Sequence, residues 1–87
     1  MSTEERIRER LKALAPEALE VVDESALHAG HQGAKSGGGH YRLTVVSPRF
    51  AGQSVMARHR MIYEALRDLM QKEIHALSIR ALAPDEF

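Results

Sequence analysis

The chain has 87 residues, enough for one domain, and 44% of them are apolar, which supports a single hydrophobic core. Only 5% are aromatic and tryptophan is absent. We therefore expect a mostly aliphatic core and few side chains on which nucleic-acid bases could stack. The formal net charge is zero. Because there is no cysteine, disulfides, a catalytic thiol and a metal site built from this chain's own thiolates are excluded.

The N-terminal residues Met1–Glu5 are acidic and lack the apolar stretch of a signal or transit peptide. No run approaches the ~18 apolar residues that a membrane span needs. A soluble cytoplasmic protein is therefore expected. Residues 26–63 contain no Asp or Glu but several Lys and Arg, which indicates either a basic surface or ordinary solvated charge.

The first predicted element is a helix that begins after Ser2, which forms a capping-box pair with Glu5. Pro16 ends this helix, because proline cannot continue it. One face carries apolar residues at helical spacing, namely Ile7, Leu11 and Leu14.

Two strands are predicted next, at Leu19–Val22 and at His40–Ser47, where apolar and polar residues alternate. They can pair as an antiparallel hairpin, but the connection from about Glu24 to Gly39 is much longer than the ~2–5 residues usual for a hairpin. This connection is rich in glycine and contains His28 and His31. Loops of this length tend to be functional or mobile.

The second half predicts a turn at residues 47–52, a helix from Ser54 to about Met70 or Gln71, and a strand from Ile74 to Leu82. A last turn is expected after Pro84. The buried face of the helix is expected to comprise Val55, Ile62, Tyr63, Leu66, Leu69 and Met70.

The second and third strands flank a helix, so we expect them to be parallel and joined by a right-handed crossover. Parallel strands begin at the same end of a sheet, and the antiparallel first strand finishes there. The long loop, His40 and His75 are therefore expected to converge at this end. Arg58 and Arg60 lie near the start of the long helix, at the opposite end of the sheet. The helix dipole does not favour cations there, so we expect a nearby carboxylate or an anionic partner to compensate their charge.

Motifs spread along nearly the whole chain resemble BolA proteins, and their order and spacing are specific although each motif alone is weak. They are Val22-Asp23-Glu24-Ser25, His28, Gly30-His31, His40-Tyr41-Arg42-Leu43, Val45-Val46-Ser47 with Phe50 and Gly52, Arg58-His59-Arg60 with Tyr63 and Leu66, and Ile74-His75-Ala76-Leu77-Ser78-Ile79. The resemblance implies an α+β fold of class II KH type, with the order αββααβ and a three-stranded mixed sheet whose helices pack on one face. It implies a single domain over residues 1–87, with the long loop at about 24–39.

The resemblance also implies a non-enzymatic partner of a monothiol glutaredoxin. The two proteins would share a two-iron two-sulfur cluster, for cluster trafficking or for iron and redox regulation. The glutaredoxin would supply cysteine thiolate and glutathione, and this chain would supply His75 with His28 as a second ligand. The loop also carries His31, so the choice of the second ligand stays open, and His40 is expected to support the site.

The chemistry of this assignment is reasonable, because imidazole replaces thiolate at one iron of Rieske centres. A chain without cysteine would have to share such a cluster. The plainer interpretations are a strand-end histidine for His75 and solvated loop histidines for His28 and His31. The same histidines could also bind zinc.

The alternative function is a DNA-binding transcriptional regulator that contacts phosphates through Arg49, Arg58 and Arg60. The GxxG loop of nucleic-acid-binding KH domains is missing, and Phe50-Ala51-Gly52-Gln53 occupies the corresponding region. No pattern favours an enzyme, because neither a phosphate-binding glycine loop nor a nucleophile with its base is visible. Neither a membrane nor a small-molecule substrate is expected as a partner.

Overall fold

The computed structural model describes residues 2–25 and 39–87. Its helices and strands run in the order α1 (Thr3–Leu11), β1 (Ala18–Asp23), β2 (Gly39–Val46), α3 (Val55–Leu66), α4 (Leu69–Lys72) and β3 (Ile74–Leu82). Short 3-10 turns occupy Lys12–Leu14, Pro48–Phe50 and Pro84–Glu86. This order confirms the predicted α+β class.

Helix α1 begins as its sequence predicts. The Ser2 hydroxyl accepts a hydrogen bond from the Glu5 backbone N–H at 3.1 Å, and the Glu5 carboxylate accepts one from the Ser2 N–H at 2.9 Å. The α-helix ends at Leu11 and tightens into a 3-10 turn. Ala15 then adopts the left-handed conformation, with φ of 49°, and the following Pro16 disfavours a return to the right-handed helical region at this position.

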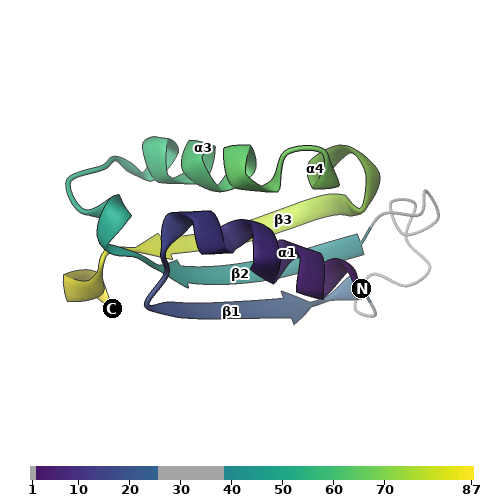
Figure 1. Cartoon of the computed structure of the whole chain (residues 1–87), viewed down its shortest axis with the longest axis horizontal. Coiled ribbons are helices and arrows are strands. Elements are labelled where there is room, and N and C mark those ends of the chain that lie inside the picture. Colours follow the sequence, from purple (N-terminus) through teal and green to yellow (C-terminus); the bar gives the residue numbers. More distant parts are fainter. Residues whose placement is uncertain (1, 26–38) are drawn as a thin grey trace.

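Strand β2 lies at the centre of the sheet, antiparallel to β1 and parallel to β3 (Figure 1). Leu43 of β2 is the Cα partner of Val21 on β1 and of Ile79 on β3. This confirms both the predicted hairpin pairing and the parallel crossover. One face of the sheet joins the core beneath the helices, and the other is open, with exposed residues that include Glu20, Arg42, Ser78 and Arg80.

The predicted helix from Ser54 to Met70 or Gln71 is two helices. Helix α3 stops at Leu66, and Arg67 has a positive φ of 49°, which breaks the helix before α4 begins. Ile62, Leu66 and Leu69 are buried as expected, but Val55 is 66% exposed. The buried residue of this first part of α3 is Arg58 instead, whose guanidinium carbon lies 6.0 Å from the centroid of the buried Phe50 ring.

Tyr63 is also more exposed than predicted, at 42%. It follows Ile62 by one residue, which turns it by about 100° from the buried stripe of α3. The core is mostly aliphatic, as the composition predicts, and burial of each large member contributes about 1.5–3 kcal/mol. Its members are Ile7, Leu11, Leu14, Val21, Tyr41, Leu43, Val45, Phe50, Ile62, Leu66, Leu69, Ile74 and Ala83.

Arg58 joins α3 to β3 and to the C-terminal turn. Its side chain is 9% exposed and donates to the backbone carbonyls of Gln53 at 2.9 Å and Ala81 at 3.1 Å. It also makes a two-bond ion pair with Glu86, whose second bond is 3.0 Å long. The sequence predicts that a nearby carboxylate or an anionic partner compensates the charge of Arg58 near the start of the helix. In the structure this carboxylate is Glu86.

The Glu86 ion pair predicts a pH dependence of stability. The hydrogen bond from Arg58, then that from the Ala83 N–H, lowers the pKa of Glu86 from 4.5 to about 2. A carboxyl with a lowered pKa stabilises the fold above its unfolded pKa, and this stabilisation is lost as pH falls through the folded value. Replacing Glu86 by Gln should therefore lower the free energy of unfolding at pH 7, with the difference from the native protein shrinking between about pH 4.5 and pH 2.

Urea unfolding at a series of pH values measures this difference. Asp85→Asn is the matched control, because it removes an adjacent exposed carboxylate outside the Arg58 ion pair. Equal effects of the two variants would contradict the prediction.

Candidate functional site

His40 and His75 meet at the end of the sheet where β2 and β3 both begin. Their ring centroids are 5.3 Å apart, with a 48° angle between the ring planes. The parallel pairing brings these two residues together, as the sequence predicts. His75 is exposed, and His40 is partly buried.

An irregular register places His75 in this position. Gly39 pairs with Ile74, but the next residue, His40, pairs with Ala76, so His75 is an extra residue on β3. Such bulges redirect a side chain and disrupt the alternation of the strand. Ile74 therefore points into the core, at 3% exposure, while His75 remains exposed directly beside it.

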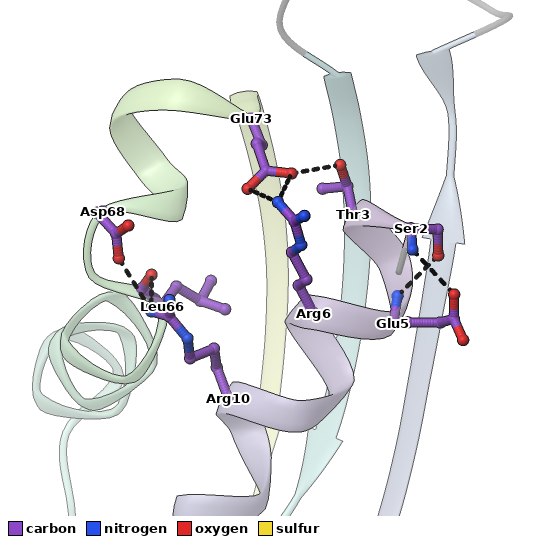
Figure 2. A network of polar contacts seen from close by, with 8 residues as sticks. All are labelled: Ser2, Thr3, Glu5, Arg6, Arg10, Leu66, Asp68 and Glu73. Carbon is purple, nitrogen blue, oxygen red and sulfur yellow. Dashed lines mark hydrogen bonds and ion pairs between the residues drawn. The ribbon is translucent and has the colours of Figure 1, made fainter.

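Contacts from α1 hold the segment that precedes the bulge (Figure 2). The Glu73 carboxylate accepts hydrogen bonds from the Thr3 hydroxyl and the Arg6 guanidinium, all at 2.9 Å. These hydrogen bonds, that from Thr3 first, lower the pKa of Glu73. The Glu73 backbone carbonyl also accepts from Gly39 N–H at 3.0 Å. The backbone two residues before His75 is thus fixed from both sides.

Gly39 is required by close packing at the start of β2. A Cβ at this position would lie 2.5 Å from the ring of Tyr41, which is itself buried. Burial, and then the charge of Asp23, raises the pKa of Tyr41. The glycine therefore lets this buried ring pack beneath the strand that carries His40.

The end of β1 approaches the same site. Asp23 accepts a hydrogen bond from the Ser25 N–H at 2.9 Å, and hydrogen bonds from Ser25 lower the pKa of Asp23. The Ser25 hydroxyl accepts in turn a hydrogen bond from the His40 backbone N–H at 3.1 Å. Next to it, Glu24 Oε2 lies 3.6 Å from Arg42 Nε, which forms an ion pair. A shallow hollow of about 180 Å³ is lined by Glu24, His40, Tyr41, Ala76, Leu77 and Ser78.

The other predicted site residues are two histidines of the long loop and three arginines. His28 and His31 fall outside the described residues. Arg49 and Arg60 are exposed. The predicted phosphate contact of Arg58 does not fit its position, because this buried guanidinium is already bonded to Glu86 and to two backbone carbonyls.

Residues 11–86 match the family model described as BolA-like protein. The chain belongs to the BolA-like family. It is 40% identical over 88 residues to the DNA-binding transcriptional regulator BolA of Escherichia coli, covering 100% of this chain and 81% of that protein. It is 46% identical over 87 residues to SufE-like protein 1 of Arabidopsis thaliana, covering 93% of this chain. The chain spans only 24% of that longer relative.

Solved structures give the same result for the fold. The BolA domain of SufE1 from Arabidopsis thaliana superimposes with a TM-score of 0.86 and 46% identity, covering 100% of this chain and 98% of that one. The structure of this BolA-like chain therefore confirms the three-stranded arrangement that the resemblance implies. No helix in the described ranges is long and apolar enough to cross a membrane.

Sequence reasoning missed two features that position His75 in this BolA-like chain. The bulge has a signal, because apolar residues Leu77, Ile79 and Ala81 follow a period of two, whereas Ile74 is out of phase with them. The contact between Glu73 and α1 has no such signal in the sequence, because Glu73 is separated from Arg6 by 67 positions and from Thr3 by 70.

The site can offer imidazole nitrogens at an open end of the sheet. Among the described residues, no group of three His, Cys, Asp or Glu side chains is placed to hold a metal ion. A larger hollow of about 620 Å³ lies between α1 and α3, but none of the predicted site residues lines it. The histidine pair is therefore the candidate site in the described part of this BolA-like chain.

The exposure of His75 predicts that its side chain contributes little to stability. His75→Ala should change the free energy of unfolding by no more than about 0.5 kcal/mol, as is usual at surface positions. Gly39→Ala, at the same sheet end, should lower it by about 1–3 kcal/mol because the added methyl group overlaps the Tyr41 ring. Urea unfolding measures both, and a comparable loss in the two variants would show that His75 has a structural role.

Proposed function

We propose that this BolA-like chain is a non-enzymatic partner of a monothiol glutaredoxin, with which it shares a two-iron two-sulfur cluster. The observation that carries the proposal is the exposed His75 in a β-bulge, beside His40, in a chain that has no cysteine. Trafficking of the cluster, or iron and redox regulation through it, is the role that the family resemblance supports.

The residues of the site fit such a group. A neutral imidazole is an established ligand of an iron in a two-iron cluster, and it raises the reduction potential relative to thiolate. His75 is proposed as the ligand from this chain, and His28 as the second, with His31 as its alternative. The remaining ligands would come from the partner, because this chain has no thiolate to supply.

The surroundings of His75 support this role. The backbone two residues before His75 is held by the Gly39–Glu73 hydrogen bond and by the contacts of Glu73 with α1, which lowers the conformational entropy lost when the ring binds. His40, half-buried and 5.3 Å away between ring centroids, would limit the orientations of the His75 ring.

Anaerobic reconstitution with a monothiol glutaredoxin, iron, sulfide and glutathione tests the proposal. The native chain should give a mixed complex whose visible absorbance and circular dichroism differ from those of the glutaredoxin alone. His75→Ala should abolish or alter this spectrum because one iron loses its imidazole ligand. His59→Ala is the matched control, since His59 lies on α3 near the other end of the sheet, and its spectrum should match the native one.

The outcomes separate two levels of the proposal. Failure of the native chain to form any mixed complex would overturn the partnership with glutaredoxin. A mixed complex with a spectrum unchanged in His75→Ala would keep the partnership but reject His75 as a ligand.

DNA binding is the second candidate, supported by the similarity to the DNA-binding transcriptional regulator BolA of Escherichia coli and by the exposed Arg49 and Arg60. If both contact phosphates, each replacement by Ala should reduce the slope of log affinity against log salt concentration by about 1. Arg80→Ala, on the open face of the sheet, should leave the slope unchanged. Fluorescence anisotropy with a labelled duplex measures these slopes, and native binding that vanishes near 0.15 M salt, roughly the physiological level, would reject this function.

A further inference from the structure

Among residues 2–25 and 39–87, strand β3 forms one edge of the sheet and pairs on one side alone. The strand order is β1-β2-β3, so within the described part of the chain only β2 pairs with β3 (Figure 1). An edge strand presents a row of backbone N–H and C=O groups to any strand of suitable sequence.

The direction of the backbone groups follows from two hydrogen bonds near the end of β3. The Leu82 carbonyl accepts from the Ser47 N–H at 2.9 Å, so Leu82 faces the β2 side. Successive residues of a strand alternate in direction, so Ala81 faces the open side. Its carbonyl there accepts from Arg58 at 3.1 Å, which closes this end of the edge.

The same alternation places the N–H and C=O groups of Leu77 and Ile79 on the open side. Their side chains are half-buried against the core, whereas Ser78 between them is exposed. The open edge of β3 therefore consists of the outward-facing backbone groups of Leu77 and Ile79, which we call the two open rungs. Arg58 limits this edge at one end.

The two edges of the sheet differ in how they are protected. Acidic residues lie along β1 and next to it, namely Glu17, Glu20, Asp23 and Glu24. Charged side chains on an edge discourage pairing with another chain. Over the nine residues of β3, the only Lys, Arg, Asp or Glu is Arg80. Charged side chains thus discourage pairing of another strand with β1 but not with β3.

We propose that the open edge of β3 binds a second copy of this chain, antiparallel to itself, with the two-fold axis at Ser78. In this register Leu77 pairs with Ile79 of the second copy, and both residues direct their backbone groups across the interface. Ser78 lies opposite its own counterpart, and Ala76 lies opposite Arg80, so no like charges face each other.

Other symmetric registers are less suitable. An axis at Ile79 pairs Leu77 with Ala81, whose carbonyl is already bonded to Arg58. An axis at Leu77 pairs Ile79 with His75, which lies in the bulge where the regular alternation is lost. Only the axis at Ser78 pairs the two open rungs with each other.

The arrangement of the layers is compatible with this pairing. A two-fold axis perpendicular to the sheet keeps the helices of both copies on one face, and the two sheets become continuous. Helices α3 and α4 are drawn above β3 in Figure 1, and the exposed Tyr63 of α3 offers apolar area in the helix layer.

The absence of cysteine allows a direct test by disulfide crosslinking. In the proposed register residue 78 forms a non-hydrogen-bonded pair with itself, for which Cα atoms lie about 4.5 Å apart. This distance is within the range of ~4.4–6.8 Å that disulfides span. Ser78→Cys, an exposed position, should therefore shift on oxidation from the monomer band to a band of twice the mass on a non-reducing gel.

Arg80→Cys is the matched control on the same strand and the same exposed face. In the proposed register its two copies are offset by four residues, or roughly 14 Å, which is too far for a disulfide. It should stay monomeric, and the double variant Ala76→Cys/Arg80→Cys should crosslink. Equal crosslinking of the two single variants, or none in Ser78→Cys with its thiol shown to be free, would overturn the proposal. Because no glutaredoxin is present, the result is independent of the cluster hypothesis.

Discussion

The parallel pairing of β2 and β3 is the constraint on which the rest of this structure depends. It requires a crossover, which α3 and α4 provide, and the buried stripe of α3 then covers the sheet. It also makes both strands begin at one end, which brings His40 and His75 to 5.3 Å between ring centroids. An antiparallel arrangement would have placed these two histidines at opposite ends.

Each end of β3 is held by a carboxylate close to the strand that binds a helix from a distant part of the chain. At the histidine end, Glu73 joins the start of β3 to Thr3 and Arg6 of α1. At the other end, Glu86 binds Arg58 of α3 and lies beside the last residues of β3. The first contact fixes the backbone before the bulge without covering His75, and the second closes the strand edge at Ala81.

Strand β3 therefore carries two exposed features side by side. His75 stands at its beginning, where the bulge turns the imidazole to solvent, and the open rungs at Leu77 and Ile79 follow directly. Since this chain has no thiolate, a cluster bound through His75 as proposed would have to be completed by another protein. The open edge has a different chemistry, because it offers only backbone groups, and the strand that they fit is a copy of β3 itself.

The sequence by itself determined the class of fold, the ends of most elements and the meeting of His40 with His75, because local spacing and the handedness of crossovers determine these features. Tertiary structure alone decided that Arg58 is an internal anchor, since its partner Glu86 lies 28 positions away. It also decided the break at Arg67 and the exposure of Val55. Neither has a periodic signal in a single sequence, whereas the exposure of Tyr63 follows from its place one residue after the buried Ile62.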